Sequence, residues 1–97
     1  MIVTITGEAE RDLEVIGDYI ALADPNRAIS FIGELREKCM ALAELPDRFP
    51  LVARFEAQGV RRRAHGNYLI FYRVERDEVV VLHILHGAQD YPATLFQ

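Results

Sequence analysis

The chain has little of several features that mark common classes of protein. Its single cysteine, Cys39, has no partner for an internal disulfide. Apolar runs such as Val79–Leu82 are far too short to cross a bilayer. The first residues lack the basic region and the long apolar stretch of a signal peptide. These absences favour the reducing cytosol, so we expect a cytoplasmic protein with no membrane partner.

Residues that catalyse reactions or bind metals are also scarce. Of the three histidines, His83 and His86 are three positions apart in a predicted strand, so they should point to opposite faces. The only serine, Ser30, falls within a predicted helix and outside any nucleophile elbow. The sequence also lacks a glycine-rich phosphate loop. We therefore expect no metal, no cofactor and no catalytic residue.

The charge of the chain is acidic and unevenly placed. The net charge is −4, with eleven acidic and six basic side chains in residues 1–58 but four acidic and five basic ones in residues 59–97. The one basic cluster is Arg61–Arg63. Because general nucleic-acid binding depends on many clustered cations, this composition argues against it.

The N-terminal half has the pattern of a strand followed by two helices. A length of 97 residues with 51% apolar side chains predicts one domain, residues 1–97, with a real core. Ile2–Ile5 reads as a short strand, and apolar residues at three- and four-residue steps predict a helix over residues 8–22, capped by Thr6. Asp24 and Pro25 then suit the start of a second helix, which closes near Leu45-Pro46. The apolar positions of the two helices are Ala9, Leu13, Ile16, Ile20 and Ala23, then Ala28, Phe31, Leu35, Cys39 and Leu42.

The C-terminal half changes to the period of strands. Three strands are predicted, Val60–His65, Tyr68–Val74 and Val79–His86, and Gly66-Asn67 fits a two-residue type II′ turn between the first two. Val79–Leu82 is apolar on both faces, which places its strand inside the sheet. Residues 46–58 read as a loop that packs Phe49, Leu51 and Phe55 on the core, and residues 88–97 as a tail. The fold is therefore α+β, in the order β-α-α-β-β-β, with a helical hairpin on a mostly antiparallel sheet.

The arginine-rich strand is the most informative local feature. Arg61, Arg63 and His65 share one face of it, and the two-residue turn sets their partners on the next strand. The expected cross-strand pairs are His65–Tyr68, Arg63–Ile70 and Arg61–Tyr72. This face is either the solvated outside of a charged edge strand or a recognition surface, since arginine and tyrosine are frequent interface anchors.

Longer matches follow one known family in order along the chain. They are Ala9…Asp12-Leu13…Ile16…Tyr19-Ile20, Asp24-Pro25…Ala28…Phe31 and Cys39…Leu42…Leu45-Pro46…Pro50, then Gly59-Val60-Arg61-Arg62, Gly66–Val74 and Val81–Ala88. With these matches the sequence resembles the RelE/ParE toxin superfamily and, within it, the ParE branch. The fold of that family, β-α-α-β-β-β, agrees with the elements predicted above.

The resemblance implies a toxin of a type II toxin–antitoxin system that forms a hetero-oligomer with a cognate, ParD-like antitoxin. ParE-like toxins are associated with inhibition of DNA gyrase, growth arrest and plasmid stabilisation. The alternative from the same superfamily is a RelE-like endonuclease that cuts mRNA on the ribosome, using basic side chains and usually a tyrosine.

Two positions separate these branches. Ribonuclease members usually carry an arginine just after the tyrosine that opens the middle strand, where this chain has Leu69, and a basic residue after the glycine of the last strand, where it has Ala88 and Gln89. Losing such groups removes charge stabilisation worth about 2.7–4 kcal/mol each. We therefore expect a non-catalytic gyrase inhibitor. Since ParE-like chains often have arginine at the place of Gln89, a decayed toxin that only binds its antitoxin is a third possibility.

The resemblance and the arginine strand together suggest which residues contact the antitoxin or the target. They are Arg61, Arg63, Tyr72, Arg73, His86, Gln89 and Asp90. Arg73 could equally be a structural ion-pair partner on the sheet. The closing Leu95-Phe96 is a further feature shared with ParE-like chains.

Overall fold

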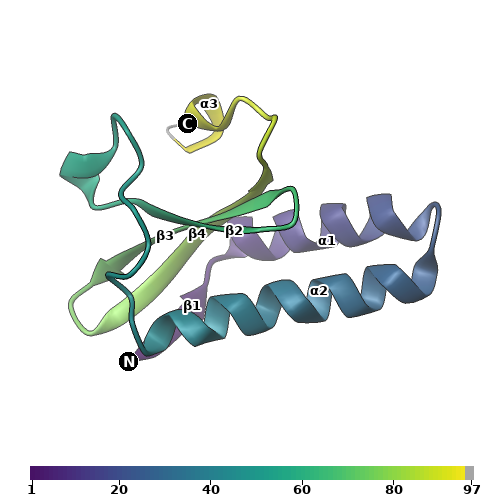
Figure 1. Cartoon of the computed structure of the whole chain (residues 1–97), viewed down its shortest axis with the longest axis horizontal. Coiled ribbons are helices and arrows are strands. Elements are labelled where there is room, and N and C mark those ends of the chain that lie inside the picture. The colour runs from purple at the N-terminus through teal and green to yellow at the C-terminus, as the bar shows by residue number, and fades with distance from the viewer. Residues whose placement is uncertain (96–97) are drawn as a thin grey trace.

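A helical hairpin lies under a four-stranded sheet in the computed structural model, which describes residues 1–95 (Figure 1). The hairpin consists of α1 (Gly7–Ala21) and α2 (Pro25–Met40). The other elements are β1 (Ile2–Ile5), β2 (Arg61–His65), β3 (Tyr68–Glu75), β4 (Glu78–His86), a short helix α3 (Tyr91–Leu95), and 3₁₀ turns at Ala41–Ala43 and Glu56–Gln58. The α+β class and the order of the main elements are as the sequence predicts. None of the helices in the described part is long and apolar enough to span a membrane.

The sheet has the strand order β1-β4-β3-β2. The two hairpins β2–β3 and β3–β4 are antiparallel, and β1 adds to the free side of β4 in parallel. This places β4 inside the sheet, as its two-sided apolar sequence indicates. Gly66 has a φ of +58° while Asn67 does not have a positive φ, which fits the predicted type II′ turn.

Both helices begin where their capping residues predict. The Thr6 hydroxyl accepts the backbone N–H of Ala9 at 3.2 Å, and an Asp24 carboxylate oxygen accepts that of Arg27 at 3.0 Å. Each cap satisfies one of the N–H groups that have no partner within the first turn. Pro25 occupies the first helical position, where it needs no N–H.

The main core fills the space between the hairpin and the sheet. Its buried residues come from one face of the helical hairpin and one face of β3 and β4, where a register shift opposite Phe71 and Tyr72 breaks the alternation along β4. They are Ala9, Leu13, Ile16, Phe31, Leu35, Cys39, Leu42, Ile70, Tyr72, Val79, Val81 and Ile84. The helical positions in this set were all predicted from their spacing. Tyr72 is fully buried, and its hydroxyl donates to the carbonyl oxygen of Pro46 at 2.6 Å.

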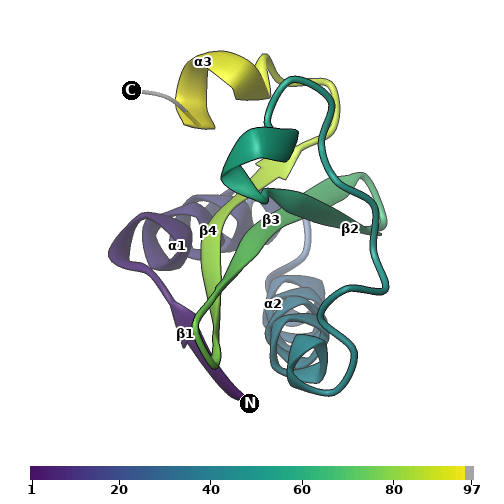
Figure 2. The ribbon, with the colours of Figure 1, turned by 90° about the vertical axis from the view of Figure 1, so that its left-hand side faces the viewer.

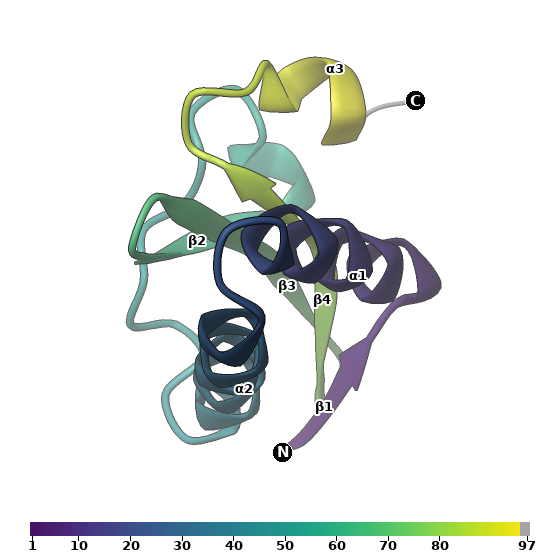
Figure 3. The same ribbon diagram turned by 90° about the vertical axis from the view of Figure 1, so that its right-hand side faces the viewer.

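A second, smaller core covers the opposite face of the sheet, where Figures 2 and 3 show α3 and the segment before β2. It consists of Val52, Phe55, Val60, Phe71 and Leu85, with Leu69, Leu82, Tyr91 and Leu95 packed against it. Phe55 is buried as expected, but Leu51 is exposed and Val52 takes the buried position. The expected tail contains α3, whose Leu95 packs on this core, while Phe96 lies outside the described residues.

β4 extends beyond the end of β1, and the side chains of Thr6, which caps α1, and of Asp12 within α1 bind its backbone there. The Thr6 hydroxyl donates to the carbonyl oxygen of Val81 at 2.8 Å. One turn into α1, Oδ2 of Asp12 accepts the backbone N–H of Ile84 at 2.9 Å and lies 2.8 Å from Nδ1 of His83. The backbone of β4 therefore keeps polar partners along this margin.

Burial should make Cys39 unreactive. Its side chain is fully buried, and loss of solvation raises the pKa of the thiol to about 11. We expect the native protein to resist a thiol reagent at about pH 8, because the thiolate is the nucleophile, and to react fully in concentrated guanidinium chloride. The raised pKa also stabilises the fold below the ordinary thiol pKa and stops doing so as the pH rises through about 11. Rapid labelling of the native protein would contradict this assignment.

Substituting Tyr72→Phe should destabilise the fold by about 1 kcal/mol, because the ring still fills its site but the Pro46 carbonyl loses its donor. For a domain of this size the melting temperature should fall by roughly 4–8 °C, measured by circular dichroism. Tyr19→Phe is the matched control, since Tyr19 is 71% exposed and should change stability by less than about 0.5 kcal/mol.

Candidate interaction surface

The arginine strand pairs as its sequence predicts, but the face that carries Arg61, Arg63 and His65 is partly buried and its side chains have partners within the chain. The three expected pairs, Arg61–Tyr72, Arg63–Ile70 and His65–Tyr68, are all present in the β2–β3 ladder. The face that holds them points toward α2 and the loop of residues 46–50, which cover it. The interpretation of this face as the solvated outside of an edge strand was wrong. The alternation of side chains along a strand shows which residues share a face, but it does not show which other segments pack on that face.

Arg61 and Tyr72 fix the loop of residues 46–50 to the sheet. Arg61 donates through Nη1 to the carbonyl oxygens of Asp47 at 3.2 Å and Phe49 at 2.7 Å. The Tyr72 hydroxyl binds the carbonyl of Pro46, and burial raises the pKa of this phenol, which keeps it a neutral donor. Three carbonyl groups of one loop are thus satisfied by two side chains that were predicted as partner contacts.

Arg63 and His65 connect the same strand to α2. Arg63 donates to the carbonyl oxygen of Lys38 at 3.1 Å, one of the last carbonyls of α2, which lack partners within the helix. Its guanidinium also lies 4.8 Å from the centre of the Phe49 ring. Nε2 of His65 lies 2.9 Å from a carboxylate oxygen of Glu34. Arg61 and Arg63 are therefore engaged within the chain.

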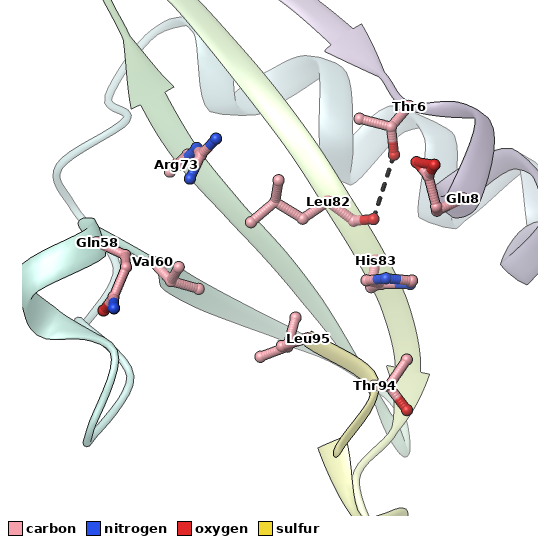
Figure 4. A pocket seen from close by; sticks show the side chains of 9 residues that line it. All are labelled: Thr6, Glu8, Gln58, Val60, Arg73, Leu82, His83, Thr94 and Leu95. Carbon is pink, nitrogen blue, oxygen red and sulfur yellow. Dashed lines mark hydrogen bonds between the residues drawn. The ribbon is translucent and has the colours of Figure 1, made fainter. Parts of the chain in front are cut away.

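Arg73 lies on the opposite face of the sheet, in a hollow of about 490 Å³ (Figure 4). Its guanidinium pairs with Glu75 at 2.5 Å, and its buried Nε has no hydrogen-bond partner among the described residues. The hollow is lined by Thr6, Glu8, Gln58, Val60, Arg73, Leu82, His83, Thr94 and Leu95. Figure 4 shows Arg73 and His83 at different ends of this lining, with Leu82 between them. With an ion pair at Arg73 and a carboxylate at Glu8, the hollow offers mixed polarity rather than a concentrated positive charge.

His86 ends β4, Gln89 and Asp90 follow it within four residues, and all three are exposed. Nδ1 of His86 accepts the backbone N–H of Ala88 at 3.1 Å, and its ring meets Tyr68 edge-on, with 5.3 Å between the ring centres. His86 therefore has a defined position beside the end of the sheet.

The start of β3, the end of β4 and the outer side of α1 border a largely apolar hollow of about 350 Å³. It is lined by Asp12, Val15, Ile16, Tyr19, Tyr68, Ile84, Leu85, His86 and Gln89. A second hollow of about 460 Å³ shares Tyr19, Tyr68 and His86 with it, so the two adjoin, and it continues toward Arg27 and Phe31 at the start of α2. We call the two hollows together the α1 groove. Of the predicted site residues, His86 and Gln89 line it.

The sequence prediction missed the apolar side of α1 that borders this groove. Val15, Tyr19 and Leu22 are 67%, 71% and 86% exposed, respectively. They follow one another at four- and three-residue steps, so they form a stripe on the outside of the helix. The signal was present in the sequence as a second set of apolar residues that the buried face of α1 does not use.

The positions that distinguish the nuclease branch carry no cation in this structure. Leu69 packs on the second core, and Ala88 and Gln89 are exposed at the end of β4. In the described part of the chain, no group of three or more His, Cys, Asp or Glu side chains is placed to hold a metal ion.

The comparisons with known proteins agree with this architecture. The chain resembles a chain of the chromosomal ParDE toxin–antitoxin system from P. aeruginosa, with a TM-score of 0.73 and 25% identity over 89% of this chain and 95% of that one. It also resembles a chain of the toxin–antitoxin complex RelBE2 from Mycobacterium tuberculosis, with a TM-score of 0.66 and 26% identity over 88% of this chain and 95% of that one. No curated protein matches it in sequence.

Fold and comparisons together define a toxin of the RelE/ParE superfamily. The model of the ParE toxin of type II toxin–antitoxin systems, parDE, matches residues 3–91, and the chain belongs to this family.

Arg61→Ala should loosen the loop of residues 46–50. The side chain is 23% exposed and makes two hydrogen bonds from a charged donor, so we expect a loss of about 1–3 kcal/mol in the free energy of unfolding. Amide exchange in residues 46–50 should rise as well. Arg62→Ala is the matched control on the same strand, because Arg62 is exposed and should change stability by less than about 0.5 kcal/mol. Equal stability of the two variants would show that Arg61 does not hold the loop.

Proposed function

We propose that this type II toxin acts in the cytoplasm by binding DNA gyrase and blocking replication, without catalysis, and that its antitoxin neutralises it by direct binding. The observation that carries the proposal is where the cations lie. Arg61 and Arg63 hold the loop and α2, and Arg73 is paired with Glu75. Leu69 and Gln89 occupy the places where ribonuclease members are expected to carry cations.

Cleavage of a phosphodiester bond needs donors that are free to stabilise charge as it develops on the phosphate. Each such group typically contributes a factor of about 10²–10³ to the rate. An arginine that satisfies backbone carbonyls cannot turn to a phosphate without leaving those carbonyls unpaired. A binding mechanism makes no such demand, because it needs only a surface complementary to the target.

Expression of the chain without antitoxin should arrest growth and induce the SOS response, because a gyrase inhibitor damages replicating DNA. The purified chain should inhibit supercoiling by gyrase in vitro, and addition of antitoxin should restore it. Primer extension on mRNA from the same cells is the comparison, since it should show no new cleavage sites. Cleavage of mRNA in translating ribosomes, with supercoiling unaffected, would assign the chain to the nuclease branch. Arrest by neither route would identify a decayed toxin.

A further inference from the structure

We propose that the hollow around Arg73, with the bare part of the sheet beside it, is the surface that binds the protein target, and that Arg73 takes an aspartate or glutamate side chain of that target. The inference rests on the proposed function, because a toxin that acts without catalysis needs a surface for its target. Three observations lead to it: a sheet face that the chain covers only in part, a donor without an acceptor, and neighbouring carboxylates that have partners.

The chain covers this face of the sheet only in part. On β4 the second core reaches Leu82. Beyond it, Val80 lies between Thr4 of β1 and Arg73 of β3, and such paired residues point to the same face. Ile2 lies two residues from Thr4 on this face and is 71% exposed. Among the described residues, Ile2 and Val80 belong to neither core. The hollow and these residues form one surface, which we call the Arg73 surface.

Arg73 carries a donor that the chain itself leaves without an acceptor. Its Nε is buried and has no hydrogen-bond partner among the described residues. Its guanidinium pairs with Glu75 of the same strand, and the two side chains are 38% and 46% exposed. An exposed pair of this kind contributes little to stability, so it leaves the guanidinium able to turn toward an acceptor in the hollow. A buried N–H group without an acceptor is rare in native proteins and calls for a partner.

The carboxylates around the Arg73 surface already have partners within the chain. Glu78 accepts a hydrogen bond from the Thr4 hydroxyl. Glu8, which lines the hollow, lies 3.7 Å from Arg11. The unsatisfied group is therefore the cationic donor, and a carboxylate of the target satisfies it. Hydrogen bonds between arginine and a carboxylate are stronger than those between neutral groups.

The hollow has room for an acidic side chain and for an apolar neighbour. Its volume of about 490 Å³ lies within the range of ligand-binding clefts, about 300–1,000 Å³. Leu82 and Leu95 are half-buried in its lining and offer apolar contacts. Figure 4 shows Leu82 near the middle of the lining, with Gln58 on one side and Glu8 on the other. An arginine in such a partly buried hollow is a typical anchor of a protein interface.

Other occupants fit this surface less well. A nucleic acid would bring its phosphates close to the carboxylates of Glu8, Glu75 and Glu78. A second copy of the chain, packed through the same face about a two-fold axis, would set these carboxylates against their own counterparts. A segment that folds on binding must bury much apolar surface, and Val60 in this lining is already buried. A folded protein that presents an acidic side chain beside an apolar one satisfies the surface.

The test uses Arg73→Gln and Gln58→Glu in the hollow and Glu75→Gln beside it. Arg62→Gln is the matched control, because Arg62 is exposed on β2 and lies outside the hollow. Binding of each variant to purified DNA gyrase is measured by surface plasmon resonance, and growth is followed in cells that express the variant without antitoxin. Circular dichroism checks that each variant is folded, and calorimetry measures its affinity for the cognate antitoxin.

We expect Arg73→Gln to weaken gyrase binding by about tenfold or more, the loss typical of a charged hydrogen bond, and Arg62→Gln by less than about threefold. Gln58→Glu adds a carboxylate that repels the acidic side chain of the target, so binding should weaken most strongly at low salt. Glu75→Gln should strengthen binding, because it removes the competing partner of Arg73, and a merely structural role of the pair would not produce this gain. Growth arrest should follow the same order, with antitoxin affinity unchanged.

Wild-type binding and arrest in both Arg73→Gln and Gln58→Glu would overturn the Arg73 surface. Loss of antitoxin affinity with gyrase binding retained would overturn it as well, as would a wild-type dimer that Arg73→Gln dissociates or arrest through cleavage of mRNA. If the wild-type chain arrests growth without binding gyrase, the proposed target fails, while the arrest caused by each variant still decides the surface. A wild-type chain that arrests nothing has no target, and this outcome overturns both.

Discussion

The structure depends on one constraint, which is that β3 and β4 are apolar on both faces and must be covered twice. The hairpin of α1 and α2 covers one face, where Tyr72 and Val81 are fully buried. The loop before β2 and the short α3 cover the other, where Phe71 is fully buried. In this 97-residue chain, the second face is covered by a loop and a five-residue helix instead of a full layer of helices or strands.

This constraint also decides how the basic side chains are used. Irregular segments that cover a sheet bring carbonyl groups without partners, and arginine is well suited to satisfy several of them at once. Arg61 binds two carbonyls of the loop, and Arg63 binds one near the end of α2. Arg61 and Arg63 are thus part of the scaffold.

The sequence predicts most of the fold because local rules determine it. The Gly66-Asn67 turn sets the register of β2 on β3, and Thr6 and Asp24 set where the helices begin. The sequence could not place β1, since a four-residue strand with three apolar side chains suits either margin of a sheet, nor show that the loop covers Arg61. The short α3 carried a signal in Pro92, within its first turn. The exposed stripe of α1 was visible as surplus apolar residues, but its groove requires Tyr68 and His86 from distant strands.

The carboxylate of Asp12 has a consequence for the behaviour of the free toxin. An uncovered strand margin invites edge-to-edge association between copies, and a long one is a route to aggregates. Past the end of β1, Asp12 occupies the Ile84 amide that an intruding strand would need. At this point β4 cannot pair with a strand of another copy unless the bond to Asp12 breaks. The apolar stripe of α1 therefore lies beside a strand margin that is protected from edge-to-edge aggregation.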